Sequence, residues 1–159
     1  KLTLNLEGAP GPDGKTRTYM VNPQDACWIY PAADLTGVER LSVGFARLPF
    51  NFGFDAAHNA VVLHPPRGPV GELEVRQDTC LSDPIAVATL PAGPVGGRAT
   101  LSVPLPARSG RHDLCFTFTS RGFDPFPALD WVQFCRFCRN GDGRFSCCPV
   151  RMAVSLAWS

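Results

Sequence analysis

Apolar and polar residues alternate along several short stretches of this chain, which is the pattern of β-strands with one buried face. In the most regular stretch, Leu114, Phe116 and Phe118 alternate with small or polar residues. After a loop, the segment Leu129–Phe134 is apolar at most positions but carries Asp130 near its start. These two stretches predict two strands joined by a loop, and we expect that loop to emerge at one rim of the fold.

A further strand is predicted where Leu73 and Val75 alternate with three charged residues. Because successive side chains of a strand point to opposite faces, we expect Leu73 and Val75 to face the core. Glu72, Glu74 and Arg76 are then expected to face solvent. An exposed position makes the two glutamates poor candidates for the enclosed carboxylate pair of a glycosidase.

The chain contains 16 prolines and 15 glycines, which interrupt it at short intervals. No segment of helical length shows a helical period of apolar residues. Short alternating runs separated by turn signals predict an all-β fold, an antiparallel β-sandwich of the jelly-roll type with about ten strands. At 159 residues the chain is expected to be one domain, residues 1–159.

Residues 135–159 are predicted to form a cysteine-rich hairpin followed by a final strand. If Asn140–Gly143 forms the turn, Cys135 faces Cys148 across the hairpin, and these two become the candidate disulfide. The alternative is a zinc site, because Cys135 and Cys138 have C-x2-C spacing and a Cys-Cys pair follows. We favour disulfides, because cysteine usage this high favours an oxidising compartment, and because paired zinc ligands usually repeat the C-x2-C spacing.

Charge and cysteine content narrow the possible partners and location. The formal net charge is +1 and only 18% of residues are charged, so no basic patch is expected to bind nucleic acid. No apolar run approaches the length of a membrane span. Seven cysteines favour an oxidising compartment, and we expect a secreted or extracytoplasmic protein. A chain that starts at Lys1 fits a processed or excised piece of a longer protein.

No common catalytic motif is present in the sequence. His112 and Asp113 are neighbours, and on a strand they face opposite sides, so they do not indicate a catalytic triad. We therefore expect the chain not to be an enzyme.

Four short motifs carry a resemblance to a known family. They are DACWIYPAADLTGVERLSV, GELEVRQD, GRHDLCFTF and ALDWVQF, which lie between Cys27 and Phe134. In these motifs the chain resembles family 6 carbohydrate-binding modules, which have a galactose-binding-like β-jelly-roll fold. The resemblance implies a non-catalytic module that binds a polysaccharide or oligosaccharide and is appended to a secreted carbohydrate-active protein, with a catalytic domain of the same protein as a further partner.

The resemblance also implies a structural calcium ion. In this family an aspartate of the Asp-Trp strand and an acid near the start of the domain bind the ion, which here suggests Asp130 and Glu7. The residues themselves leave two alternatives open for Asp130. A carboxylate between Leu129 and Trp131 needs a partner, which is either Ca²⁺ or a set of hydrogen-bond donors.

The sugar site implied by the resemblance lies at the loop end of the sandwich. There the family uses two aromatic residues and an asparagine, but this chain has Ala128 at the asparagine position and Arg98 after the Gly-Gly pair. The candidate contacts are Trp28, Tyr30, Arg98, Phe123 and Phe126. Trp28 and the loop phenylalanines could instead belong to the core. Because expected contacts are missing, the second hypothesis is a structural or protein-interaction jelly roll that lacks a working sugar site.

Overall fold

The computed structural model describes residues 4–7, 18–21, 27–49, 65–122, 124–139 and 145–150. The strands are β1 (Leu4–Glu7), β2 (Thr18–Val21), β3 (Trp28–Asp34), β4 (Val38–Leu48), β5 (Glu72–Gln77), β6 (Ala86–Thr89), β7 (Arg98–Pro104), β8 (Arg111–Phe118), β9 (Phe126–Arg139) and β10 (Phe145–Val150). Side chains are described for β3–β8 and for β9 as far as Arg136, which is seven strands rather than the about ten expected. The strands β1, β2 and β10 are described by their backbone pairing alone.

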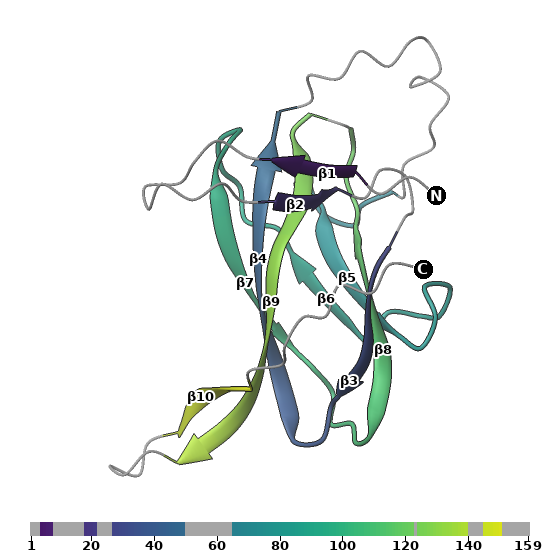
Figure 1. Cartoon of the computed structure of the whole chain (residues 1–159). Coiled ribbons are helices and arrows are strands. Elements are labelled where there is room, and N and C mark those ends of the chain that lie inside the picture. Colours follow the sequence, from purple (N-terminus) through teal and green to yellow (C-terminus); the bar gives the residue numbers. More distant parts are fainter. Residues whose placement is uncertain are drawn as a thin grey trace.

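The strands form two antiparallel sheets that face each other (Figure 1). One sheet has the order β1-β2-β9-β4-β7, with β10 also paired to β9, and the other has the order β3-β8-β5-β6. The part of the chain that the structure describes contains no helix, and none that could span a membrane. The predicted fold class, an all-β antiparallel sandwich, is confirmed.

The core lies between the two sheets and follows the alternation of the sequence. The larger sheet contributes Leu41, Val43, Phe45, Leu101, Val103, Leu129 and Phe134, and the smaller one contributes Leu73, Val75, Leu114, Phe116 and Phe118. Fully burying one such side chain stabilises the fold by about 1.5–3 kcal/mol. The stretch that alternates most regularly in the sequence, β8, is therefore a central element of the core.

The outer face of the smaller sheet differs from the prediction. Glu72, Glu74 and Arg76 are buried, with exposed fractions of 3%, 2% and 9%. Loops on either side of β5 fold over this face: Gly68 N donates a 2.6 Å hydrogen bond to Glu72 Oε1, and Arg76 Nε donates a 2.8 Å bond to Ser82 O. The alternation correctly separates the two faces, but it does not show that loops cover the polar one.

The buried charges on this face have partners. Glu72 also accepts a 2.6 Å bond from Thr119 Oγ1, and Glu74 pairs with Arg76 and Arg67. Burial raises the pKa of Glu72, but hydrogen bonds from Thr119, Gly68 and Arg67 outweigh burial and hold the net pKa below its usual value. The paired glutamates stabilise the loops rather than face a cleft.

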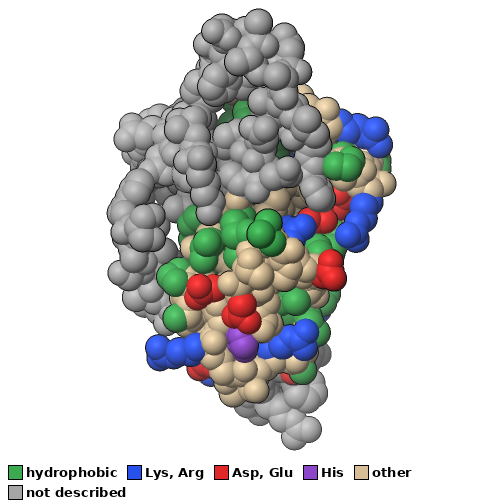
Figure 2. All heavy atoms as spheres, turned by 90° about the vertical axis from the view of Figure 1, so that its right-hand side faces the viewer, with side chains coloured by type: hydrophobic (Ala, Val, Ile, Leu, Met, Phe, Trp, Pro, Cys, Tyr) green, Lys and Arg blue, Asp and Glu red, His purple; other side chains and the backbone are tan. Residues whose placement is uncertain are grey.

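Beyond these loops, the surface on the right-hand side of Figure 1 carries charges of both signs. Figure 2 shows acidic and basic side chains interspersed on this face with hydrophobic side chains between them. Neither sign forms a continuous field on the part of this face that is described.

The register of the C-terminal hairpin differs from the prediction by one residue. Phe145 pairs with Arg139, so five residues connect the strands, and Cys135 pairs with Pro149 while Cys148 pairs with Arg136. The expected four-residue turn is therefore wrong. A bridge between Cys135 and Cys148 stays a prediction, because the side chain of Cys148 lies outside those described.

Candidate functional site

The two aromatic residues predicted from β3 belong to the core. Tyr30 is 7% exposed, and its ring packs edge-on against Phe134 at 5.1 Å between centroids. Trp28 is partly buried and packs against Phe116 at 5.4 Å. Tyr30 presents no open face on which a sugar could stack, and Trp28 presents only part of its ring.

The predicted rim residues of β9 are buried as well. Phe126 is 6% exposed and Ala128 is fully buried, and they pair with Leu48 and Ala46 in the middle of the larger sheet. Phe123 lies outside the described residues. Of the predicted sugar contacts that the structure describes, Arg98 alone is exposed to solvent.

Arg98 lies beside an exposed aromatic residue that the sequence reasoning did not consider as a ligand contact. Trp131, on the outer face of the larger sheet, is 37% exposed and pairs across the sheet with Gly44. A Cβ placed on Gly44 would overlap Nε1, Cε2 and Cδ1 of the Trp131 indole. The indole therefore lies across the bare backbone of β4, a position that any larger residue at 44 would obstruct.

A pocket of about 200 Å³ lies next to this indole. It is formed on neighbouring strands β4, β7 and β9 by Gly44, Phe45, Arg98, Ala99, Thr100, Asp130 and Trp131. The pocket thus combines an exposed aromatic ring with a guanidinium group, a hydroxyl group and a carboxylate.

A β-bulge explains why Asp130 and Trp131 both line the pocket. Trp131 pairs with Gly44 and Leu129 pairs with Phe45, so Asp130 is an extra residue on β9. Strict alternation would place Asp130 and Trp131 on opposite faces, whereas a bulge re-aims side chains locally. The sequence does contain one signal, since a glycine inside an apolar strand often marks close approach of another group.

The position of Asp130 bears on the predicted calcium site. Asp130 is half-buried rather than buried and shares its pocket with the cationic Arg98. The other expected ligand, Glu7, is on β1, and β2 lies between β1 and β9 in the sheet. Within the described part of the chain, the only group of three or more candidate metal ligands consists of cysteines. The calcium site at Asp130 and Glu7 stays a prediction, because the side chain of Glu7 lies outside those described.

A histidine and an aspartate do interact on the surface, but not in a catalytic arrangement. His112 Nδ1 lies 3.0 Å from Asp78 Oδ1, and His112 Nε2 lies 3.1 Å from the backbone oxygen of Ser109. A triad would need the hydroxyl of a nucleophile at the second nitrogen. This cluster instead joins the start of β8 to the end of β5.

Three cysteines lie together on the outer face of the smaller sheet. Cys27 and Cys80 form a disulfide with 6.3 Å between Cα atoms, and Cys115 is a buried thiol beside it. Cys135 is also disulfide-bonded, to a partner outside the described side chains. The bridge between Cys27 and Cys80 agrees with an oxidising compartment.

Two solved structures resemble this chain over most of its length. One is a family 6 carbohydrate-binding module from Clostridium cellulolyticum in complex with xylose, with a TM-score of 0.56, 16% identity, and coverage of 83% of this chain and 85% of the module. The fold resembles that of a family 6 carbohydrate-binding module. The resemblance noted in the sequence is thereby confirmed at the level of the fold.

The other structure is a glycoside hydrolase family 43 arabinoxylan arabinofuranohydrolase from Bacillus subtilis in complex with cellotetraose. Its TM-score is 0.57 at 17% identity, and the match covers 83% of this chain. This chain spans 24% of the length of that enzyme. No protein-family model and no curated protein matches the chain.

Proposed function

We propose that this chain is a non-catalytic carbohydrate-binding module that contacts its ligand through Trp131. Sugars have apolar faces that stack on aromatic rings, while polar groups around the ring fix their orientation. The exposed indole supported by Gly44 carries this proposal, because Arg98, Thr100 and Asp130 lie beside it in the same pocket. These polar groups can exchange hydrogen bonds with sugar hydroxyls.

The proposal includes a secreted parent protein that acts on carbohydrate. The Cys27–Cys80 disulfide supports export to an oxidising compartment. The Bacillus subtilis enzyme supports attachment to a catalytic domain, since a fold of this kind occupies about a quarter of that longer chain. Polysaccharide or oligosaccharide is the proposed ligand.

A second function, a structural or protein-interaction jelly roll, is supported by the residues at the predicted sugar-binding rim. Tyr30 and Phe126 are buried and Ala128 replaces the expected asparagine, so the family's usual contacts are largely missing. In this alternative Trp131 and its pocket contact a protein surface instead of a sugar.

Binding of the wild type and two variants to insoluble xylan and cellulose separates the two functions. Trp131→Ala removes the exposed ring, while Leu81→Ala is a matched control, because Leu81 is 95% exposed on a distant turn. We expect Trp131→Ala to lower the bound fraction at least about tenfold, equivalent to about 1.4 kcal/mol. Leu81→Ala should bind as the wild type does. Equal binding by all three proteins, or none by any, would exclude the proposed site.

A further inference from the structure

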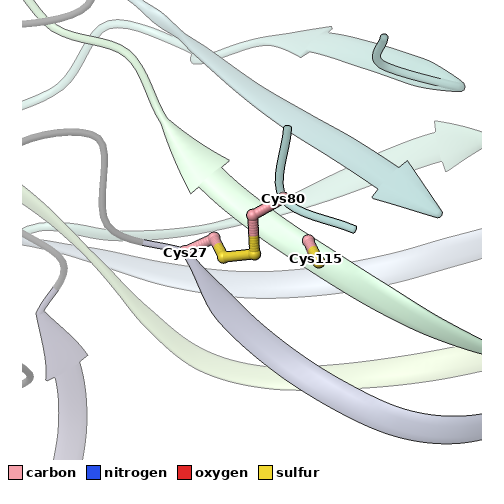
Figure 3. Close-up of side chains that lie close together, drawn as sticks. All are labelled: Cys27, Cys80 and Cys115. Atoms are coloured by element: carbon pink, nitrogen blue, oxygen red, sulfur yellow. A yellow bond between two sulfur atoms is a disulfide. The ribbon is translucent and has the colours of Figure 1, made fainter. Parts of the chain in front are cut away.

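Three sulfur atoms meet at the outer face of the smaller sheet. The Sγ atoms of Cys27, Cys80 and Cys115 all lie within 4.8 Å of one another (Figure 3). Cys27 and Cys115 are 6% and 0% exposed, and Cys80 is half-buried. Two of these sulfurs form the disulfide, and the third belongs to a thiol directly beside it.

The pairing of β3 with β8 determines the positions of two of the three sulfur atoms, those of Cys27 and Cys115. Cys115 is in β8 and pairs with Ile29, and Cys27 directly precedes β3, two residues before Ile29. Residues two apart on a strand share a face, so Cys27 and Cys115 stand on the same side of neighbouring strands. Their positions are set by the core packing of β3 and β8 rather than by the disulfide.

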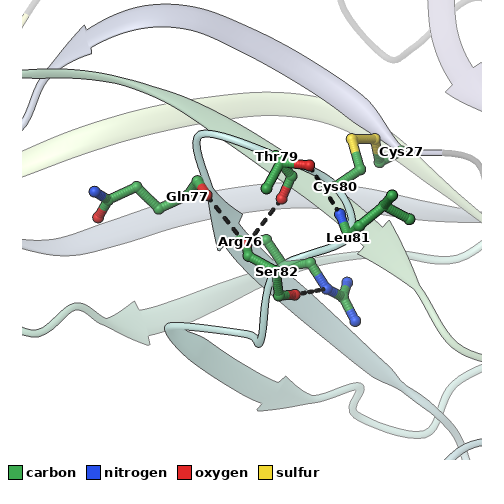
Figure 4. The surroundings of a disulfide bond; sticks show 7 residues. All are labelled: Cys27, Arg76, Gln77, Thr79, Cys80, Leu81 and Ser82. Atoms are coloured by element: carbon green, nitrogen blue, oxygen red, sulfur yellow. Dashed lines mark hydrogen bonds between the residues drawn. A yellow bond between two sulfur atoms is a disulfide. The ribbon is translucent and has the colours of Figure 1, made fainter.

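The third sulfur comes from a turn that folds back on the sheet. Cys80 follows β5. The Ser82 hydroxyl holds the turn by sharing its one proton between Thr79 O at 2.9 Å and Gln77 O at 3.1 Å (Figure 4). Arg76, which pairs with Cys115, donates a bond to the backbone oxygen of Ser82. These bonds hold the turn over Cys115 without involving any of the sulfur atoms.

We propose that the same three cysteines form a zinc site in the reduced protein. Thiolate sulfur suits borderline and soft cations such as Zn²⁺ and does not suit hard cations. Zinc–sulfur bonds of about 2.3 Å place tetrahedral thiolates roughly 3.8 Å apart. The Sγ atom of Cys115 already lies within 4.8 Å of the other two, and reduction frees the Sγ atoms of Cys27 and Cys80 to move apart to the spacing of zinc ligands. A water completes the fourth position.

The disulfide and the zinc site exclude each other, since both use Cys27 and Cys80. A phosphine supplies the two electrons that reduce the disulfide and becomes a phosphine oxide with oxygen from water. Each cysteine sulfur of the former disulfide gains one proton. Zinc then displaces the protons of three thiols, so its binding weakens as the pH falls. An added small-molecule disulfide takes up the two electrons, becomes two thiols, and re-forms the Cys27–Cys80 bridge, which releases the metal.

The test compares metal binding by the oxidised and the phosphine-reduced protein, after removal of phosphine and metal. Cd²⁺ is the spectroscopic probe, because thiolate ligands give it a charge-transfer absorption, and Zn²⁺ is used in melting experiments. We expect reduction to lower the melting temperature of the wild type and Zn²⁺ to restore much of the loss. Cys115→Ser should lose this restoration, with at least about tenfold weaker Zn²⁺ binding in competition with a chelator.

The Cys115 variants in their oxidised form are the control for folding, because Cys115 takes no part in the disulfide and the Cys27–Cys80 bridge stays intact in them. Oxidised Cys115→Ser should melt cooperatively, and Cys115→Ala serves if serine is not tolerated at this buried position. The remaining cysteines of the tail are present in every variant, so their metal binding cancels in the comparison. Equal zinc affinity and equal cadmium absorption for reduced wild type and both Cys115 variants would overturn the proposal, as would reduced wild type that Zn²⁺ does not stabilise.

Discussion

The indole of Trp131 lies across the backbone of Gly44, its cross-strand partner on the outer face of the larger sheet. This relationship leaves a large aromatic ring 37% exposed beside the bulge of β9, next to a pocket with charged walls. An exposed tryptophan in an ordered position is more informative than an exposed side chain in a loop, because the sheet fixes the ring for a ligand.

Gly44→Ala should displace the indole. The added methyl group overlaps the Trp131 ring, and overpacking of this kind costs about 1–3 kcal/mol. We expect a lower free energy of unfolding in urea, a changed tryptophan emission maximum and weaker binding to xylan. Gly122→Ala, which adds the same methyl group at a glycine where no other atom lies within 4 Å, is the matched control. Unchanged emission in Gly44→Ala would contradict the described contact.

The Cys27–Cys80 disulfide should contribute strongly to stability. It joins residues 53 apart in the sequence, and a loop of this length corresponds to about 4 kcal/mol in the chain-entropy model. We expect Cys27→Ser and Cys80→Ser to lose similar amounts, measured by urea unfolding of the oxidised, metal-free proteins. The double variant should lose no more than either single variant. Additive losses would show that the two cysteines do not act as one bridge.

Glu72 should make stability depend on acid pH. Its pKa in the folded state is below the ordinary value of 4.5, because hydrogen bonds to the carboxylate outweigh the effect of burial. A depressed pKa adds stability that is fully present above the unfolded value and is lost as the pH falls through the folded value. Stability should therefore decline below about pH 4.5.

Glu72→Gln tests this assignment, since it keeps the size of the side chain but removes the charge. We expect a loss of about 1–3 kcal/mol at pH 7 and a flatter decline of stability in acid than in the wild type. Urea unfolding between pH 3 and 7 measures both effects. A parallel decline in both proteins would assign the acid sensitivity to other carboxylates.

The calcium prediction remains to be tested at Asp130. If an ion binds there with a ligand such as Glu7, a chelator should lower the melting temperature of the wild type but not that of Asp130→Asn. Arg98 lines the same pocket, and its positive charge opposes the binding of a cation at Asp130. From the described neighbours alone, we expect the chelator to leave the melting temperature unchanged. A drop in melting temperature that persists in Asp130→Asn would place any ion elsewhere.

Alternation in the sequence predicted the sandwich because β-strands have a strict period of two, as in Leu114, Phe116 and Phe118. It could not show which outer face is covered, so Glu72 and Glu74 were expected in solvent although loops bury them. It also missed the Trp131 site, because the bulge at Asp130 interrupts the period.

The predicted sugar contacts depended on matching single positions to a family pattern. That match placed Tyr30 and Phe126 near a binding rim, but their direction is set by pairing with neighbouring strands, which buries both rings. The contact between residues 44 and 131 depends on the pairing of β4 with β9, which a single strand pattern does not contain.

The central claim, that this domain binds sugar through Trp131, is tested most directly by nuclear magnetic resonance. Titration with xylo- and cello-oligosaccharides follows the indole Nε1–H signals, which Trp131→Ala assigns by removing one of them. We expect a millimolar dissociation constant, about −4 kcal/mol, with the Trp131 indole and the backbone amides of Gly44 and Thr100 shifting together. Shifts that leave the Trp131 signal unmoved, or no shifts with any sugar, would contradict this claim.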